Sequence, residues 1–456
     1  MRRKALIASA IALALTGTAW ALVRPDQALR LGAGVAAHHV CTMTFVGGQA
    51  PDAIFRELVT PVLGKAGAGL LTAHVDRTQG RVAVDGLVST LATATYTPGY
   101  GCRLDLPGNV PLVPDTRMVA DVDDGFAPAT LVTSDKPTVT AALDQVFAEH
   151  AGGAPKVVKA VVIVKDGKVV AERYAPGVGI HSPLISFSVA KSFTNAFLGM
   201  LAADGKVDVK QPLNAPEWRQ PGDPRAKITI EDLMRMQSGL DADEAESPFS
   251  FVAKMEFLHG DMAGYTALQP AKEAPGKTFE YTSGDTLLLD RLIGEQVGGG
   301  PAGLREFARK RLFEPMHMGD VTMEFDGQGT FVGSTYVYTS ARNYARFGLL
   351  YLNDGKAPDG TRLLPEGWVG WSRTSALGAP YGAGFWTNDG PSDVARHRVD
   401  GGFPKDGFYA SGTLGQRIYI VPSEHLVITR FGYSAPPSYG IEDDVALIKA
   451  AIDAYR

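Results

Sequence analysis

The clearest hydrophobic patterns in the chain are two pairs of strand-like segments, one in its first half and one near the C-terminus. Residues 157–165 and 168–174 are rich in Val and are separated by Asp166-Gly167. An Asp-Gly dipeptide between two β-rich runs is one of the strongest short-range hairpin signals. Residues 415–422 and 426–431 form a second such pair. The pattern therefore predicts two antiparallel hairpins.

Helical periodicity flanks and separates the two hairpins. Apolar residues recur at helical spacing in 138–150 and 443–455, and 188–203 is mostly apolar. A further helix is expected to begin at Thr229, where Asp232 follows at the spacing of a capping box. If the outer hairpins meet in one sheet and the middle forms a helical insertion, the fold class is α+β.

The leading region carries shorter alternating stretches, such as 81–85 and 91–96, followed by turn signals. We predict that residues 22–134 form a β-containing N-terminal extension, either as a small module or as a wrap around the main region. The main domain is then predicted to span residues 135–456.

The first 21 residues have the features of a secretory signal peptide. Met1-Arg-Arg-Lys4 is basic, residues 5–15 are apolar, and Ala19-Trp-Ala21 provides a small-x-small cleavage pattern. These features predict an exported, periplasmic or secreted protein without stable membrane insertion after cleavage. An uncleaved anchor is the alternative, because residues 5–23 just reach the length of about 17–25 residues that spans a bilayer.

The only two cysteines, Cys41 and Cys102, lie in the N-terminal quarter of the chain, and whether they pair depends on export. In an oxidising compartment they would form one disulfide, which would disfavour the unfolded chain by roughly 4 kcal/mol. Two unrelated buried thiols are the alternative.

Composition narrows the class of protein further. The 456 residues include 44 basic and 49 acidic side chains, for a net charge of −5, and 45% are hydrophobic. A chain of this length and hydrophobicity can bury a full core. No basic footprint for nucleic acid is present. We therefore expect a soluble globular protein that acts on a small molecule or a short peptide-like substrate.

Ser188-Val-Ala-Lys191 is the central candidate for chemistry. Side chains three apart on a helix share one face, so the lysine amine can approach the serine hydroxyl. A desolvated lysine can act as the base that a serine nucleophile needs. One such spacing is expected by chance, but this helix is nearly apolar, so Lys191 should be shielded from solvent.

A second candidate lies downstream in a glycine-bounded segment. Tyr281 and Ser283 are two residues apart there, and side chains at that spacing in an extended segment point the same way. As phenol or phenolate, Tyr281 can relay a proton to a leaving group. Tyr338 and Ser340 repeat the spacing, but Ser340 is expected to begin a helix.

Together these segments resemble the serine β-lactamase and penicillin-recognising superfamily, particularly its class C-like esterases, D-aminopeptidases and 6-aminohexanoate-dimer hydrolases. The motifs that carry the resemblance are Ser188-x-x-Lys191, Tyr281-x-Ser283, Ala410-Ser-Gly412, Leu233–Leu240, Ser340–Gly348 and Tyr381–Trp386. They cover about residues 135–456, and the leading region resembles the N-terminal extension of the amide-hydrolase branch.

The resemblance implies a role for each motif residue. Ser188 would be the acylated nucleophile, Lys191 its base, and Tyr281 the acid/base on the leaving group, with Ser283 where relatives more often have Asn. The backbone N–H groups of Ser188 and Thr413, beside Gly412, would hold the oxyanion.

The third motif departs from the family pattern. Relatives usually open it with Lys or His, and Ala410 stands there instead. The loss of a cation argues against penicillin carboxylates and for neutral esters or amides, or it signals weakened catalysis.

Other polar clusters contribute less. No HExxH or HxxEH motif and no CxxC occurs, so we predict no metal, and no cofactor is implied. The acidic residues Asp241, Asp243, Glu244 and Glu246 either line the entrance to the site and select cationic groups, or form a solvated loop.

The sequence therefore predicts an exported serine hydrolase that cleaves a small ester or amide through an acyl-enzyme on Ser188. A D-stereospecific peptidase or carboxypeptidase acting on cell-wall fragments is one alternative. A non-catalytic binding protein of the same fold is the other, and the oligomeric state is open.

Overall fold

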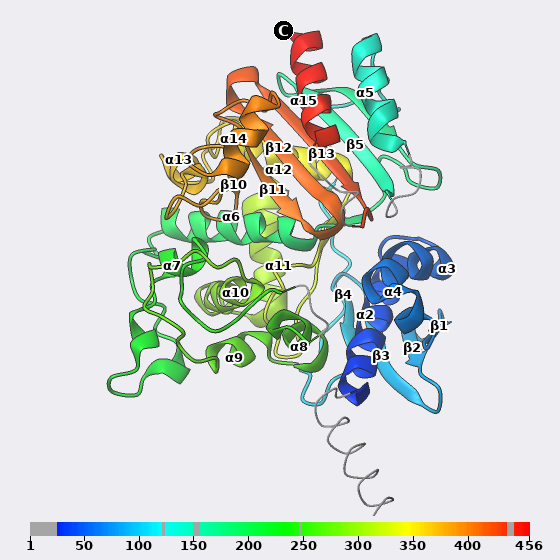
Figure 1. The fold of residues 1–456 in the computed structure, drawn as a ribbon, viewed down its shortest axis with the longest axis vertical. Coiled ribbons are helices and arrows are strands. Elements are labelled where there is room, and N and C mark those ends of the chain that lie inside the picture. The colour runs from blue at the N-terminus through cyan, green and yellow to red at the C-terminus, as the bar shows by residue number, and fades with distance from the viewer. Residues whose placement is uncertain (1–24, 121–123, 149–155, 246–248, 436–441) are drawn as a thin grey trace, which may run out of the picture.

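The two predicted hairpins meet in one six-stranded antiparallel sheet in the computed structural model (Figure 1). The strand order is β10-β11-β12-β13-β5-β6. The strands are β5 (Val158–Lys165), β6 (Lys168–Tyr174), β10 (Trp386–Thr387), β11 (Phe408–Gly412), β12 (Gln416–Val421) and β13 (Leu426–Gly432). Asp166 and Gly167 both have positive φ, as the mirror-image turns that match strand twist require. Pairing of β13 with β5 joins the two distant hairpins.

The structure describes residues 25–120, 124–148, 156–245, 249–435 and 442–456. The predicted signal peptide, residues 1–21, lies outside them. Among the helices of the described residues, none combines the length and apolar character needed to cross a bilayer.

Helices cover both faces of the sheet, as the predicted layer fold requires. On one face lie α5 (Pro137–Phe147) and α15 (Glu442–Tyr455), and on the other lies α12 (Ala341–Leu352). Helix α6 (Ala190–Ala203) packs on α12 through stacked rings of Phe193 and Phe347, with centroids 3.9 Å apart. Strand β5 is buried from both sides, which explains its almost unbroken run of Val and Ile.

The middle of the chain forms the predicted helical insertion and a small second sheet. The capping box at Thr229 and Asp232 begins α7, as predicted. The helices are α7 (Ile230–Met234), α8 (Phe251–Leu258), α9 (Met262–Ala267), α10 (Ser283–Val297), α11 (Gly300–Ala308), α13 (Trp368–Arg373) and α14 (Asp393–Asp400). Strands β7 (Leu184–Ile185), β8 (Thr322–Met323) and β9 (Val337–Thr339) form a sheet in the order β7-β9-β8.

The N-terminal extension contains the predicted strands and a long helix that the pattern did not predict. Its elements are α2 (Pro25–Phe45), α3 (Pro51–Ile54), α4 (Thr60–Ala68), β1 (Thr72–Asp76), β2 (Arg81–Asp85), β3 (Thr90–Thr97) and β4 (Gly101–Leu104). The four strands pair in chain order. Residues 31–44 of α2 are all buried. The helix therefore lacks the exposed polar face, and with it the amphipathic period, by which a surface helix is recognised in a sequence.

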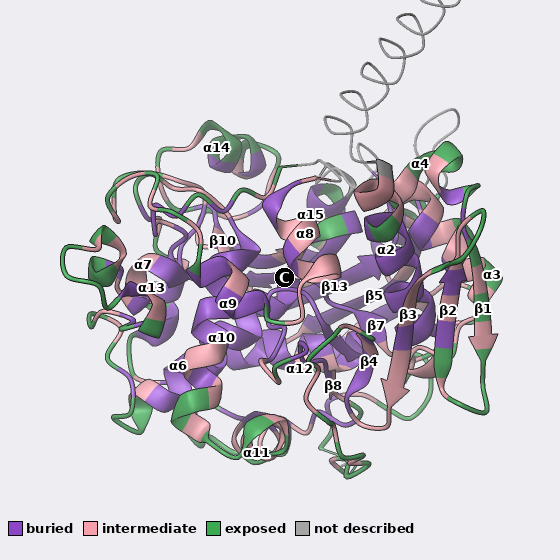
Figure 2. Cartoon of the chain, turned by 90° about the horizontal axis from the view of Figure 1, so that it is seen from below, coloured by how far each residue is buried: buried purple, intermediate pink, exposed green. Residues whose placement is uncertain are grey.

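The extension shares its core with the rest of the molecule. One continuous cluster of buried side chains includes Val40 and Met43 of α2 together with Phe193 of α6 and Phe347 of α12. Figure 2 shows buried residues through the middle of the molecule, α2 included, and exposed residues at its periphery. The extension is therefore packed into the fold rather than appended to it.

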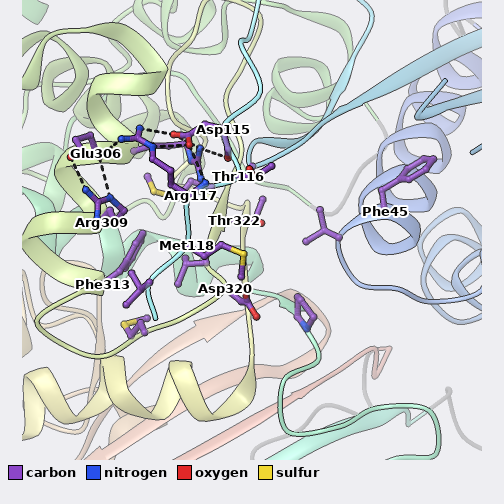
Figure 3. Close-up of a pocket in the computed structure, with 18 of the residues that line it drawn as sticks. Phe45, Asp115, Thr116, Arg117, Met118, Glu306, Arg309, Phe313, Asp320 and Thr322 are labelled. Atoms are coloured by element: carbon purple, nitrogen blue, oxygen red, sulfur yellow. Dashed lines mark hydrogen bonds and ion pairs between the residues drawn. The ribbon is translucent and has the colours of Figure 1, made fainter. Parts of the chain in front are cut away.

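A pocket of about 350 Å³ lies where the extension meets α11 (Figure 3). Ion pairs line one wall: Arg117 contacts both Asp115 and Glu306, and Arg305 lies 2.9 Å from Asp115. Phe45 lies on another wall. No residue of the three motifs lines this pocket, and we interpret it as part of the joint between the extension and α11.

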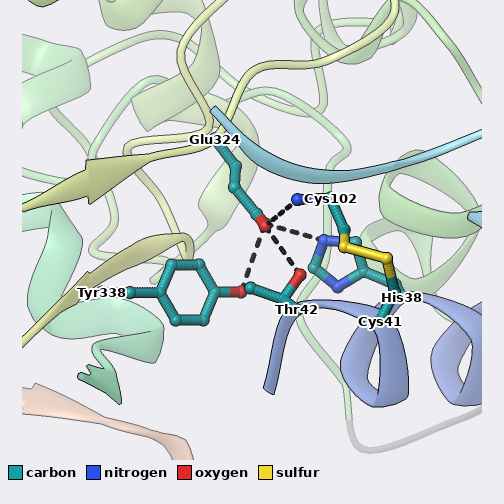
Figure 4. Close-up of a disulfide and its surroundings, with 6 residues drawn as sticks. All are labelled: His38, Cys41, Thr42, Cys102, Glu324 and Tyr338. Carbon is teal, nitrogen blue, oxygen red and sulfur yellow. Dashed lines mark hydrogen bonds and ion pairs between the residues drawn. A yellow bond between two sulfur atoms is a disulfide. The ribbon is translucent and has the colours of Figure 1, made fainter. Parts of the chain in front are cut away.

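A disulfide and a buried carboxylate form a second joint (Figure 4). Cys41 of α2 is bonded to Cys102 of β4, as one of the two sequence alternatives predicted. Beside it, Glu324 accepts hydrogen bonds from Thr42 (2.7 Å) and from the backbone N–H of Cys102 (2.7 Å). Its other oxygen lies 2.8 Å from His38 Nε2. Groups of the extension thus balance a charge buried in the main domain.

Candidate active site

Ser188 lies on a tight turn between strand β7 and helix α6. Residues Phe187–Val189 form one 3₁₀ turn, and Phe187 has φ of +43°, which is unfavourable for a bulky residue. Ser186 holds this turn: its Oγ donates to the carbonyl of Thr335 at 2.8 Å and accepts from the N–H of Val337 at 2.9 Å. The strained backbone therefore sits in a fixed frame, as is common at functional sites.

Lys191 lies directly behind Ser188. Its Nζ is 3.0 Å from Ser188 Oγ, 2.9 Å from Ser283 Oγ and 3.1 Å from the carbonyl oxygen of Ser334. As an ammonium it donates to all three oxygens. As a neutral amine it can still donate to Ser283 and Ser334, and its lone pair then accepts the Ser188 hydroxyl. This geometry is what a lysine base requires.

Burial favours the neutral form of Lys191. Its side chain is only 3% exposed, and this desolvation lowers its pKa below the ordinary lysine value. The nearby charges of Glu244, Glu256 and Asp290 act in the opposite direction and raise it. Ser188, in contrast, is partly exposed, so its hydroxyl lies nearer to solvent than the Lys191 amine.

Tyr281 and Ser283 lie on the other side of Lys191. The lysine Nζ is 4.8 Å from the centre of the Tyr281 ring, and Ser283 is the first residue of α10. Burial is the main reason that the pKa of Tyr281 is raised well above its usual value, although a hydrogen bond with Ser188 partly opposes this. Of the two protonation states considered from the sequence, the phenol is therefore favoured over the phenolate.

The sequence left the position of Glu244 open, and the structure defines it. Its carboxylate accepts the backbone N–H of Ser283 at 2.6 Å and the Ser283 hydroxyl at 3.1 Å. This contact fixes the start of α10, and with it the hydroxyl beside Lys191. Glu246 lies outside the described residues, so the two alternatives for the acidic cluster, an entrance to the site or a solvated loop, stay predictions.

The third motif brings strand β11 against the nucleophile turn. A Cβ at Gly412 would lie 2.5 Å from the carbonyl oxygen of Ser186 and 3.0 Å from the nitrogen of Ser188, so only glycine fits. Strand β10 pairs with β11 only at Phe408 and Tyr409, which leaves the edge from Ala410 to Gly412 without a strand partner in the described part of the chain.

Aromatic side chains form one wall of the site. The ring of Tyr281 lies 5.6 Å from that of Tyr381 and 5.5 Å from that of Trp386. Both partners come from the Tyr381–Trp386 stretch that resembles the family.

The structure brings the three motifs together but shows contacts that sequence reasoning missed. These are the Ser334 carbonyl, the Ser186 frame and the Glu244 carboxylate. None belongs to a motif with fixed spacing, and only Glu244 carried a signal, through its acidic neighbours. No group of three or more His, Cys, Asp or Glu residues suited to a metal occurs among the described residues.

Comparison with known proteins identifies relatives of this chain. The β-lactamase family model matches residues 143–451, more than half of the chain. A 6-aminohexanoate-dimer hydrolase of Paenarthrobacter ureafaciens is 24% identical over 318 residues, covering 65% of this chain and 79% of the relative.

Two solved structures show the same fold. One is a Bacillus anthracis protein provisionally assigned as a 6-aminohexanoate-dimer hydrolase, with 23% identity, a TM-score of 0.57, and coverage of 74% of this chain and 89% of that one. The other is a penicillin-binding protein homologue of Caulobacter crescentus, with 17% identity, a TM-score of 0.51, and coverage of 74% and 100%. The chain therefore belongs to the β-lactamase family and has the fold of its serine hydrolases.

Proposed function

We propose that this protein is an exported serine hydrolase that cleaves a small amide or ester through an acyl-enzyme on Ser188. The observation that carries the proposal is the position of Lys191 Nζ, buried and 3.0 Å from a partly exposed serine hydroxyl. A lysine in this environment serves as a general base, because desolvation disfavours its charged form.

The reaction follows from this geometry. Neutral Lys191 accepts the proton of Ser188 as Oγ attacks the substrate carbonyl carbon. The oxyanion is held by the backbone N–H groups of Ser188 and Thr413. Tyr281, as a phenol, passes its proton to the leaving amine or alkoxide as the bond to the carbonyl breaks, and it recovers a proton from the Lys191 ammonium, so that both groups regain their starting protonation states. Water then hydrolyses the ester on Ser188 and restores the free hydroxyl.

The substrate is expected to be uncharged beside the third motif. Ala410 provides no cation for a carboxylate, and the partly exposed aromatic side chains of Tyr281 and Trp386 offer an apolar surface. The relative named a 6-aminohexanoate-dimer hydrolase supports an amide over an ester. The disulfide is consistent with export, since disulfides persist in oxidising compartments.

A fluorophosphonate probe tests the acyl-enzyme mechanism. We expect intact-mass analysis to show one adduct on the wild type and none on Ser188→Ala. Lys191→Met should label slower by about 10²-fold or more, in line with the loss of a general base. Lys206→Met, which removes an exposed lysine just beyond the end of α6, is the matched control and should label at the wild-type rate.

A folded wild type that forms no adduct would contradict the proposal and would favour the non-catalytic binding protein. If the adduct forms, panels of amides, esters and D-peptides identify the substrate class. Preferential cleavage of D-peptides would favour the cell-wall peptidase alternative.

A further inference from the structure

The missing cation of the third motif has a counterpart on the neighbouring strand. Arg417 of β12 lies opposite Ser411 in the strand register and is 7% exposed. Its Nη1 donates to the carbonyl oxygen of Gly412 at 3.0 Å and to that of Gln416 at 2.8 Å. A buried guanidinium is thus bound to the last residue of the third motif.

The carbonyl that Arg417 binds belongs to the peptide unit of the proposed oxyanion donor. Gly412 C=O and Thr413 N–H are the two ends of one planar peptide group and point in opposite directions. A cation bound to the carbonyl end polarises the unit and makes its N–H a stronger donor. Because Arg417 is itself buried, solvent screens its charge less than that of an exposed arginine.

The register shows on which face of the strand Arg417 lies. Residues alternate between the faces of a strand, so Ser411 and its partner Arg417 lie on the face opposite to Gly412. Gly412 is the residue that presses against the nitrogen of Ser188. Arg417 therefore binds the Gly412–Thr413 peptide from the face opposite to the one that meets the Ser186–Ser188 backbone.

A second arginine provides an internal comparison. Arg430 of β13 donates to the carbonyl of Gly415 at 2.6 Å and to Ser434 Oγ at 2.7 Å. It is as buried as Arg417 and contacts the same turn, but Gly415 lies outside the Gly412–Thr413 peptide. Any general effect of a buried arginine on the turn should therefore appear at both positions.

We propose that Arg417 is a positioning residue that supplies, through the Gly412–Thr413 peptide, the positive charge that Ala410 does not provide. Charge from behind the peptide stabilises the oxyanion of any ester or amide, whereas a lysine at position 410 would also bind a substrate carboxylate. The site thereby keeps electrostatic stabilisation and loses selection for anionic substrates. This inference rests on the acyl-enzyme mechanism proposed above.

The test compares Arg417→Lys, which keeps the charge, with Arg417→Gln, which removes it. The purified full chain is acylated with a p-nitrophenyl ester carrying ¹³C at its carbonyl, and rapid-mixing infrared spectroscopy follows the ester carbonyl on Ser188. We expect Arg417→Gln to raise the carbonyl stretching frequency, because the oxyanion donor is weakened. Acylation should slow about tenfold or more, which is less than the rate loss of about 10²–10³ that follows complete removal of an oxyanion donor. Arg417→Lys should stay near wild type, and KM should change little in either variant.

Arg430→Gln is the control and should keep the wild-type carbonyl frequency even if its thermal stability falls. Equal losses in Arg417→Lys, Arg417→Gln and Arg430→Gln would show a structural role and overturn the inference, as would a wild-type frequency in Arg417→Gln. If Arg417→Gln does not fold, Arg417→Met is the second neutral variant. A wild type that is not acylated would instead refute the underlying mechanism, so the two failures are distinguishable.

Discussion

Lys191 is poised between two opposing influences. Burial lowers its pKa, while the carboxylates of Glu244, Glu256 and Asp290 raise it. Glu256, like Asp290, contacts neither Ser188 nor Ser283 in the structure: its Oε1 accepts the Thr335 hydroxyl at 2.6 Å. Thr335 follows Ser334, whose carbonyl oxygen binds Lys191. Glu256 therefore acts on Lys191 in two ways: its negative charge raises the lysine pKa, and its hydrogen bond with Thr335 holds the neighbouring backbone in place.

Glu256→Gln should shift the pH dependence of Ser188 labelling to lower pH. Lys191 reacts as the neutral amine, so the labelling rate rises as pH passes upward through its pKa. Removing the negative charge of Glu256 lowers that pKa, so the rising limb should move to lower pH. Glutamine can still accept the Thr335 hydroxyl. Rates of fluorophosphonate labelling against pH measure the shift.

The exposed Glu366→Gln serves as the control and should leave the pH profile unchanged. If the rising limb of the labelling rate stays in place or moves to higher pH in Glu256→Gln, then Glu256 does not stabilise the ammonium form of Lys191.

At the scale of single elements, strand β11 has the strictest requirement. Its third-motif glycine lies against the backbone of the nucleophile turn, where a single added carbon would meet the oxygen of Ser186 and the nitrogen of Ser188. The turn after it is also constrained, since Leu414 has φ of +61°. The strand must therefore keep its position to within a fraction of an ångström if the oxyanion site is to form.

Gly412→Ala should reduce the acylation rate by about 10²-fold or more, because the strand must move away from the Ser188 N–H. Gly294→Ala in α10 is the matched control: an added Cβ there meets nothing within 4 Å, and alanine favours the helix by up to about 1 kcal/mol. Stopped-flow measurement with a p-nitrophenyl ester compares the two. A wild-type rate in Gly412→Ala would show that the oxyanion is held elsewhere.

How well each element could be predicted depended on how local its signal was. The Asp166-Gly167 hairpin and the Thr229 capping box are encoded by neighbouring residues, and both occur as predicted. Helix α2 is buried on all sides and has no such pattern. The three motifs indicated the site, but its supporting contacts link residues that are far apart, such as Lys191 with the Ser334 carbonyl. Only the folded chain reveals those.

At the scale of the whole molecule, the extension is tied to the main domain by covalent and ionic contacts. The disulfide joins α2 to β4, and Glu324 is bound from both. The extension also contributes to the continuous core. Its stability and that of the main domain are therefore coupled.

Replacing both cysteines by alanine should lower the free energy of unfolding by about 4 kcal/mol, since the bridge closes a loop with a sequence separation of 61 residues. Urea denaturation of the two proteins measures the difference. Reductant should destabilise the wild type and leave the double variant unaffected. Equal stability of oxidised wild type and double variant would show that the bridge does not restrict the unfolded chain.

The arrangement around Glu324 also limits how relatives can exchange parts. Three of its contacts, His38, Thr42 and the Cys102 backbone, come from the extension, and Tyr338 supplies a fourth from the main domain. A chimaera with a crossover near residue 134 would receive a buried acid from one parent and its donors from the other. Recombination within this family should succeed only when both halves of that contact are inherited together.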